Sequence, residues 1–199
     1  STTNVAYTKT ATGSPTGFSP TGWDGNEFID DDYKAIAVDD TTQFVLTTAT
    51  AVGEYPQMLF CFHTTQIPFL VNRLVLYYVV GMGDDGQTND LILYIWNDAT
   101  ALWEVRRTDY LGATTTTLMD EFEITSTNYI DSSSNIYYML SSSLPTTGGD
   151  AIELANDYIS LCVDVSNKGP TGPRGLTGPT GADGDSLTGP TGSQGDSLT

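Results

Sequence analysis

Basic residues are scarce in this sequence. It has 7 Lys and Arg against 25 Asp and Glu in 199 residues, which gives a formal net charge of -18 at pH 7. Nucleic acids and anionic membrane surfaces are bound through clusters of Lys and Arg, so the composition argues against both as partners. The residues before Gly169 include 22 acids and 6 bases and so carry a charge of -16. This charge would keep closely spaced copies of the chain from associating nonspecifically.

Histidine, cysteine and long apolar runs are scarce as well. His63 is the only histidine, so a catalytic triad or a His-based metal cluster would rest on one residue, and we interpret it as a structural histidine at a strand end. Two cysteines, Cys61 and Cys162, cannot define a disulfide framework. Two free buried thiols are favoured slightly over a single bridge. No run approaches 18 apolar residues, so no membrane-spanning helix is expected.

The C-terminal part of the sequence has a glycine at every third position. The series comprises Gly169, Gly172, Gly175, Gly178, Gly181 and Gly184, followed after an interruption by Gly189, Gly192 and Gly195. Only glycine fits where three chains meet at the axis of a collagen triple helix. A flexible Gly/Pro-rich linker is the alternative, but a linker needs no fixed phase. The pattern therefore predicts a collagen-like, triple-helical stalk over residues 169–199 and a homotrimer.

The stalk sequence resembles a known group of proteins. Its Gly-Pro-Thr triplets at 169–171, 178–180 and 189–191 are similar to the collagen-like stalks of bacterial surface and spore-coat proteins, phage fibres and some large-virus surface proteins. The resemblance implies a parallel homotrimer that carries a globular head at an extracellular, cell-surface or virion-surface location. It also implies O-linked sugars on threonines at the third position of the triplet, here Thr171, Thr177, Thr180 and Thr191. The interruption at Asp185–Thr188, which recurs at Asp196–Thr199, departs from a perfect repeat.

Residues 26–168 are predicted to form an all-β head. Short runs rich in Val, Ile, Tyr, Phe and Thr alternate with turn residues, as is typical of an antiparallel, jelly-roll-like β-sandwich. Two runs, Leu74–Val80 and Leu91–Trp96, are almost entirely apolar, which indicates central strands covered on both faces or lining a subunit contact. The expected strands are Tyr33–Val38, Gln43–Ala49, Gln57–His63, Arg73–Val80, Leu91–Trp96, Leu102–Arg107, Leu118–Ile124, Asn135–Leu140 and Tyr158–Val165.

The stretch from Leu91 to Val165 is also loosely similar to β-sandwich modules of secreted prokaryotic proteins and virion proteins, some of them related to galactose-binding-like domains. The similarity rests on Leu-Tyr-Ile-Trp-Asn at 93–97 followed by Leu-Trp-Glu-Val at 102–105. It implies a fold and no functional residue.

Residues 1–25 form an N-terminal arm of different character. Asn4–Thr12 can form a short Thr-rich strand, whereas Pro15-Thr16-Gly17 and Pro20-Thr21-Gly22 interrupt any longer one. Such an arm can add a strand to the sheet edge of a neighbouring subunit, or it can pack on its own head. The sequence leaves both arrangements open.

Few residues suggest a ligand site. The acid clusters Asp30-Asp31-Asp32, Asp39-Asp40 and Asp84-Asp85, with Asp24, could bind Ca²⁺ but follow no calcium-loop pattern, so solvated turn acids are favoured and no cofactor is expected. Aromatic residues could stack on sugars, although most aromatic side chains of a β-sandwich belong to its core. Because neighbouring strand residues point to opposite faces, each Tyr-Tyr pair must divide between two faces. The aromatic candidates are Trp23, Tyr77, Tyr78, Trp96, Trp103, Tyr110, Tyr137 and Tyr138.

Two functions follow from these observations. The first is a structural subunit of an extracellular fibre, filament or surface appendage, which trimerises through its stalk and polymerises if the arm exchanges strands. The alternative is a glycan-binding adhesin head displayed on the stalk, with trimerisation supplying avidity. The structural function is preferred because the clear features concern assembly. An enzyme is not expected, since no constellation of polar residues indicates catalysis.

Overall fold

The structure is a computed structural model of the chain. It describes residues 4–40, 45–83, 89–110, 116–124, 127–147 and 151–165. The chain divides into two units, residues 1–167 and 168–199. The second unit contains the predicted axis glycines from Gly169 to Gly195 and the candidate glycosylated residues Thr171, Thr177, Thr180 and Thr191, all of which lie outside the described residues.

The described part of the first unit consists mainly of β-strands, with one short α-helix, α1, at Asp30–Ala35. Single 3-10 turns lie at Pro20–Gly22, Pro68–Leu70 and Thr127–Tyr129. The strands are β1 (Val5–Thr12), β2 (Asn26–Glu27), β3 (Val45–Ala49), β4 (Glu54–His63), β5 (Val71–Gly83), β6 (Leu91–Asn97), β7 (Leu102–Asp109), β8 (Thr116–Glu123), β9 (Asn135–Ser142) and β10 (Ile152–Val165).

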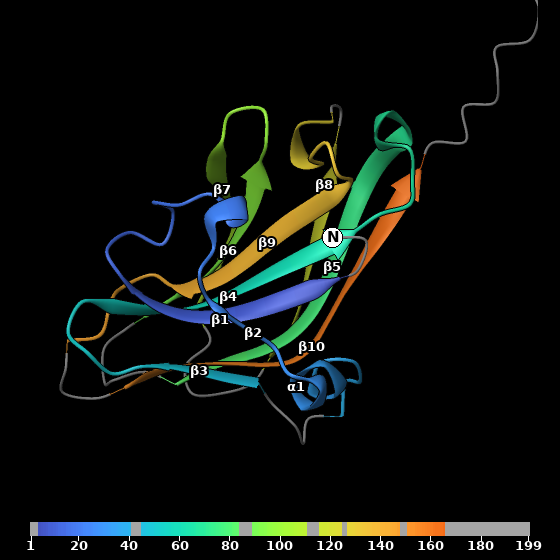
Figure 1. The fold of residues 1–199 in the computed structure, drawn as a ribbon. Helices are drawn as coiled ribbons and strands as arrows, with labels where there is room; N and C mark the ends of the chain where they lie inside the picture. The colour runs from blue at the N-terminus through green and yellow to red at the C-terminus, as the bar shows by residue number, and fades with distance from the viewer. Residues whose placement is uncertain are drawn as a thin grey trace, which may run out of the picture. The chain divides into compact units, whose positions relative to one another are not determined.

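These strands form two antiparallel sheets that lie one on the other (Figure 1). Sheet A has six strands in the order β2-β1-β4-β9-β6-β7, and sheet B has four in the order β3-β10-β5-β8. Every strand neighbour in either sheet is paired in the antiparallel sense. The predicted all-β, antiparallel sandwich is therefore confirmed for the head.

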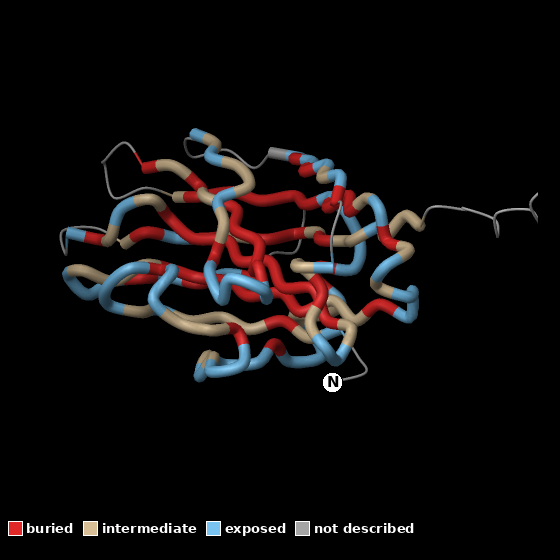
Figure 2. The backbone as a smooth tube through the Cα atoms, turned by 90° about the horizontal axis from the view of Figure 1, so that it is seen from above, coloured by how far each residue is buried: buried red, intermediate tan, exposed pale blue. Residues whose placement is uncertain are grey.

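The main core lies between the two sheets. Alternate residues of β4, such as Met58 and Phe60, face alternate residues of β5, such as Leu74, Leu76 and Tyr78, and all five are almost completely buried. Figure 2 shows that buried residues are concentrated along the central strands. Burying one such side chain stabilises the head by roughly 1.5–3 kcal/mol, so this layer supplies most of the driving force for folding.

The two most apolar runs occupy interior positions, as predicted. β5 lies between β10 and β8 in sheet B, and β6 lies between β9 and β7 in sheet A. β5 extends beyond the predicted strand Arg73–Val80, because Gly81, Met82 and Gly83 still pair with β10. Glycine lacks a side chain that would identify it as part of a strand, so the predicted strand ended too early, at Val80. Asp84 and Asp85 lie outside the described residues.

One predicted strand is wrong. Residues 33–38 do not form a strand, because Asp30–Ala35 form helix α1. Asp30, Asp31 and Asp32 occupy the first turn, where negative charges are favoured by the helix dipole. The Asp32 carboxylate also accepts the backbone N–H of Ile29 at 3.0 Å, which closes the start of the helix. The three aspartates thus stabilise the first turn of helix α1.

The N-terminal arm is part of sheet A. β1 pairs with β4 along its whole length, from Val5 opposite Cys61 to Thr12 opposite Glu54, and with β2 on its other side. The strand predicted for Asn4–Thr12 is thereby confirmed. In the part of the chain that the structure describes, this strand completes sheet A of its own head.

An ion pair links the two sheets along one edge of the sandwich. The edge strands there are β7 of sheet A and β8 of sheet B. The register of β7 shifts between Arg107 and Val105, which makes Arg106 an extra, bulged residue. Its guanidinium bonds both oxygens of Asp120 in β8, at 3.2 and 3.3 Å, and lies 3.8 Å from the centre of the Phe122 ring. Arg106 therefore joins the two sheets at this edge, where Arg107 also donates to the Met119 carbonyl at 2.9 Å.

Candidate functional site

The outer face of sheet A, which points away from sheet B, carries a second apolar cluster. Residues that alternate with the core positions of β1, β4, β9, β6 and β7 meet there, and most of them are buried. The strand register places them side by side, because Tyr7 is opposite Leu59, Leu59 is opposite Met139 and Met139 is opposite Tyr94. The buried members are Leu59, Cys61, Tyr94, Trp96, Trp103, Tyr137 and Met139. An apolar face of this kind on a surface sheet needs a covering element or a ligand.

Part of this face is covered by residues 13–25, which we call the covering segment. Phe18 contacts Trp23 and Trp103 edge to face, with ring centres 4.6 and 6.4 Å apart. Trp103 donates its indole N–H to the Phe18 carbonyl at 2.8 Å, and the ammonium of Lys9 lies about 5.5 Å from the ring centres of Phe18 and Trp23. Gly25 ends the segment, where a side chain would collide with Trp23.

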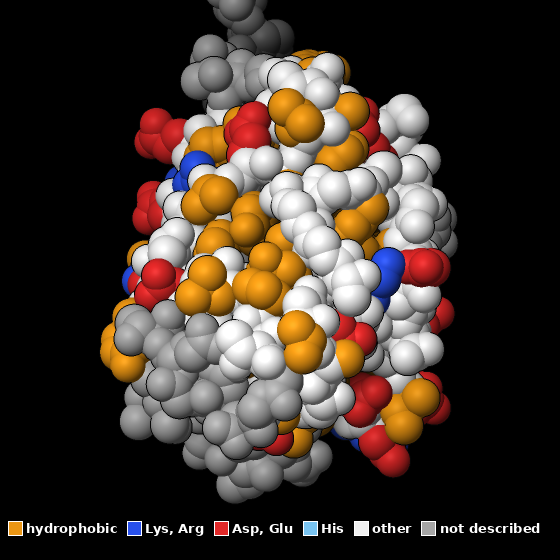
Figure 3. Space-filling view, turned by 90° about the vertical axis from the view of Figure 1, so that its left-hand side faces the viewer, with side chains coloured by type: hydrophobic (Ala, Val, Ile, Leu, Met, Phe, Trp, Pro, Cys, Tyr) orange, Lys and Arg blue, Asp and Glu red, His pale blue; other side chains and the backbone are white. Residues whose placement is uncertain are grey.

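A pocket of about 290 Å³ lies between the covering segment and the sheet. Its lining combines aromatic rings with fixed polar groups: Val5, Tyr7, Pro20, Thr21, Trp23, Leu59, Cys61, Asn135 and Tyr137. Figure 3 views the side of the head on which the covering segment lies in Figure 1, and it shows hydrophobic side chains gathered in the middle of that side. The site is therefore amphipathic, with ring faces beside hydrogen-bonding groups.

The polar wall of the pocket is held by Asp131, in the turn before β9. Its carboxylate accepts the backbone N–H groups of Ser133 and Asn135, both at 2.8 Å, and the Tyr137 hydroxyl at 3.0 Å. The Asn135 amide donates to the same carboxylate at 3.2 Å. Burial alone would raise the pKa of Asp131, but these hydrogen bonds outweigh burial and lower it. The carboxylate thus fixes Asn135 and Tyr137 in place.

The lowered pKa of Asp131 makes a pH-dependent prediction. A carboxylate whose pKa is lower in the folded head stabilises that head above the unfolded pKa of about 3.9, and the stabilisation disappears as the pH falls through the folded value. We expect Asp131→Asn to cost about 1–2 kcal/mol of unfolding free energy at pH 7. The difference from the wild type should shrink as the pH falls from 5 toward 2, as measured by urea unfolding at each pH. A difference that stays constant with pH would contradict this role.

The thiol of Cys61 forms part of the pocket floor. Burial raises its pKa to about 11, so the thiol stays protonated at neutral pH and is a poor nucleophile. Burial also raises the pKa of Tyr137, with Cys61 and Asp131 adding to the effect, so its hydroxyl keeps the proton that it donates. The site therefore offers binding groups, and the described residues around it offer no activated nucleophile.

The second cysteine differs from its prediction. Both cysteines are free, but only Cys61 is buried, and Cys162 is exposed. Leu161 and Val163 contact the main core, so the residue between them points to the outer face of sheet B. An alternating strand buries every second residue only, which the apolar run Ile159–Val165 concealed in the sequence.

The structure divides the aromatic candidates among different surroundings. Trp23, Trp96, Trp103 and Tyr137 meet on the outer face of sheet A. Tyr78 and Tyr138 point into the main core, so each Tyr-Tyr pair divides as predicted. Tyr77 (40% exposed) and Tyr110 (61% exposed) do not belong to the cluster. The sequence analysis did not identify Tyr7, Thr21 and Asn135. Tyr7 could have been recognised, because it is two residues from Val5 in an alternating strand and so shares its face.

The remaining candidates are structural. His63 ends β4, as predicted; its backbone N–H is bound by Asn4 at 2.8 Å and its ring lies 3.2 Å from the Asn135 oxygen. Asp24 pairs with Lys9, and Asp31 pairs with Lys34. Among the described residues, no group of three or more His, Cys, Asp and Glu side chains could hold a metal ion.

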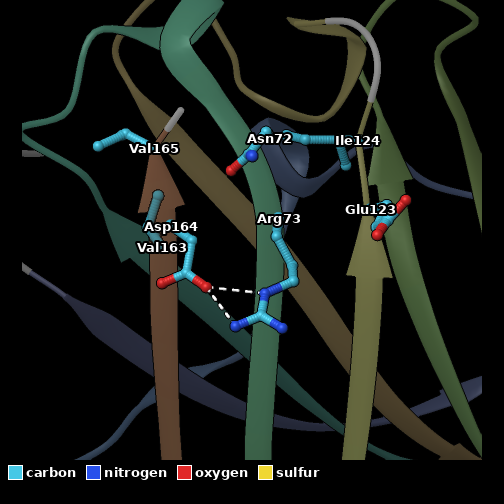
Figure 4. Close-up of a pocket in the computed structure, with 7 residues that line it drawn as sticks. All are labelled: Asn72, Arg73, Glu123, Ile124, Val163, Asp164 and Val165. Atoms are coloured by element: carbon cyan, nitrogen blue, oxygen red, sulfur yellow. Dashed lines mark hydrogen bonds and ion pairs between the residues drawn. The ribbon is translucent and has the colours of Figure 1, made fainter. Parts of the chain in front are cut away.

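A larger pocket, of about 760 Å³, lies at one end of sheet B. Figure 4 shows Arg73 of β5 reaching toward Asp164 of β10 inside it. Arg73 bonds Asp164 at 2.6 Å and Glu121 of β8 at 2.7 Å, so its charge is already used in joining three strands. We therefore assign no ligand to this pocket. Within the described ranges, no helix is long and apolar enough to span a membrane.

Comparisons with known proteins give one family and several similar folds. Residues 1–165 match a protein family described as "Uncharacterized protein, C-terminal domain", and a search of curated proteins found no match. Three solved structures are similar at low sequence identity. One titled "CBM4 structure and function" has a TM-score of 0.40 and 11% identity over 81% of this chain and 94% of its own.

The second, "Family 16 Carbohydrate Binding Module-2", has a TM-score of 0.35 and 12% identity over 64% of this chain and 96% of its own. The third, the N-terminal cellulose-binding domain of a β-1,4-glucanase from Cellulomonas fimi, has a TM-score of 0.33 and 11% identity over 61% of this chain and 90% of its own.

Proposed function

The chain belongs to the family described as "Uncharacterized protein, C-terminal domain", and we propose that this member is a glycan-binding head displayed on a collagen-like, homotrimeric stalk. The observation that carries the proposal is the pocket on the outer face of sheet A, where aromatic rings and fixed polar groups meet. The proposed location is extracellular, on a cell or virion surface.

The pocket has the chemistry that a sugar ring requires. A pyranose has apolar C–H faces and a rim of hydroxyls, so its binding site needs flat ring surfaces beside oriented hydrogen-bonding groups. Trp23, Tyr7 and Tyr137 supply rings, while Asn135 and Thr21 supply polar groups at the pocket wall. Because Asp131 already fixes Asn135 and Tyr137, little conformational entropy would be lost on binding.

The charge of the head favours a neutral ligand. Residues before Gly169 carry a charge of -16, and the Lys9 ammonium beside the rings is paired with Asp24. A carboxylated or sulfated sugar would be repelled by this field. We therefore assign the site to neutral hexose chains.

The period-three stalk supports display as a trimer. Residues 169–199 would bring three heads together, and three weak sites on one stalk bind a repeating surface much more tightly than one site does. Sugars on Thr171, Thr177, Thr180 and Thr191 would protect such a stalk. Polymerisation by exchange of the N-terminal arm has no support in the pairing of β1, which completes sheet A of its own head.

The test is calorimetric titration of the full chain with neutral hexaoses of glucose, mannose and galactose. We expect at least one to bind, and Trp23→Ala to weaken that binding about tenfold or more through loss of ring stacking. Tyr77→Ala is the matched control, because Tyr77 is a half-exposed aromatic residue on sheet B. Absence of binding by the wild type, or equal affinity of the Trp23→Ala variant, would refute the proposal.

A further inference from the structure

Gln57 is a polar residue in an unusual position. It lies in β4, in the apolar run Tyr55–Phe62, and its side chain is completely buried. Both its amide oxygen and its amide nitrogen lack a hydrogen-bond partner in the described structure. Most buried side-chain polar atoms in proteins have a partner, so an amide with neither atom bonded calls for an explanation.

The side chain of Gln57 belongs to the outer face of sheet A. Met58 and Phe60 point into the main core, and Leu59 and Cys61 point outward to the second cluster. Gln57 has the phase of the outward residues. Its cross-strand neighbours are Lys9 of β1 and Ser141 of β9.

This position adjoins the pocket. Leu59, which lines the pocket, is two residues from Gln57 on the same face of β4, a spacing of about 7 Å. The two side chains therefore lie next to each other on the face that carries the pocket. A sugar chain that filled the pocket and continued along β4 past Leu59 would bring its next sugar toward Gln57.

We propose that the Gln57 amide is a second subsite that binds the next sugar of a neutral hexose chain. The proposal rests on the glycan-binding function proposed above and makes its ligand at least a disaccharide. A primary amide donates and accepts at once, so it can bond two neighbouring hydroxyls of one sugar. Because the amide is completely buried, the proposal requires that the side chains covering it, with Lys9 directly opposite, move when the second sugar binds.

The proposal explains why a destabilising group persists in the strand. A buried amide without partners destabilises the folded head, and an apolar side chain of the same size would not. Binding groups that are strained or unsatisfied without their ligand are a common cost of function. We therefore expect the Gln57 amide to lower the stability of the free head and to raise its affinity for a sugar chain.

The experiment compares Gln57→Met with the wild type in two measurements on the full chain. Methionine keeps the length of the side chain and removes the amide. Thermal unfolding without ligand should show a higher Tm for the variant. Calorimetric titration should show about tenfold weaker binding of the disaccharide and hexaose of the hexose that binds the wild type, with monosaccharide binding unchanged.

Thr47→Val is the matched control. The Thr47 hydroxyl is also buried without a partner, but it lies in β3 of sheet B. This variant should raise the Tm without changing affinity for any sugar. A lower Tm for Gln57→Met, or unchanged affinity for the longer sugars, would overturn the subsite while leaving the glycan-binding function intact. A wild type that binds no hexaose would overturn both.

Discussion

Trp103→Ala should reduce the unfolding free energy of the head by about 3–5 kcal/mol, the range for truncating a buried tryptophan. Trp103 is only 7% exposed, although it lies on the outer face of sheet A. Its ring contacts Trp96 edge to face at 5.3 Å, and its indole N–H bonds the Phe18 carbonyl at 2.8 Å. The substitution therefore removes both a packed ring and an anchor of the covering segment. Urea unfolding monitored by far-ultraviolet circular dichroism measures the loss.

Trp103→Phe separates these two contributions. Phenylalanine keeps a ring against Trp96 but cannot donate to Phe18, so about 1 kcal/mol of the loss should remain for the missing hydrogen bond. Hydrogen exchange at the amides of residues 13–25 should become faster in both variants, because the segment loses its bond to the sheet. Unchanged stability of Trp103→Ala would show that the covering segment does not hold this face closed.

Arg106→Met should cost about 3 kcal/mol, because it leaves a buried carboxylate without its partner. The Asp120 side chain is only 8% exposed, and Arg106 bonds both of its oxygens. The substitution also removes the guanidinium from the face of Phe122. Since Asp120 belongs to sheet B and Arg106 to sheet A, the substitution weakens the contact between the two sheets. Denaturant unfolding of the variant measures it.

A double variant tests whether the charge pair itself is responsible. Arg106→Met with Asp120→Leu removes both charges, and two apolar residues in place of a buried pair are often tolerated. The double variant should therefore be more stable than Arg106→Met alone. If the two substitutions instead add, the pair is not coupled and the loss reflects packing of the long arginine side chain.

Most strands of the head could be predicted because they are short apolar runs that lie between turn residues. Leu74–Val80 and Leu91–Trp96 are apolar on both faces, and both lie inside their sheets. This pattern failed at 33–38, where Ala35–Val38 looked strand-like but the acids before it start a helix. Local hydrogen bonding at a helix start competes with apolar patterning, and a short sequence does not show which prevails.

The candidate site was only partly predictable for a different reason. Trp23 and Tyr137 were recognisable as aromatic residues able to stack on sugars, and strand alternation required Tyr137 and Tyr138 to point to opposite faces. Which one faces the pocket depends on how β9 pairs with β4 and β6, which no local pattern encodes. Tyr7 and Asn135 meet across more than a hundred residues of chain. Gln57 gave one local signal, a polar residue in an apolar strand.

Because only one of the two cysteines is exposed, the head can be attached to a surface through a single residue. Cys162 is exposed on sheet B, whereas Cys61 is buried on sheet A with its pKa raised to about 11. Maleimides react with accessible thiolates, so a maleimide-coated sensor chip would capture the head through Cys162. Every immobilised head would then present the outer face of sheet A to the solution. Uniform orientation of this kind would allow weak sugar binding to be measured on a dense, regular layer.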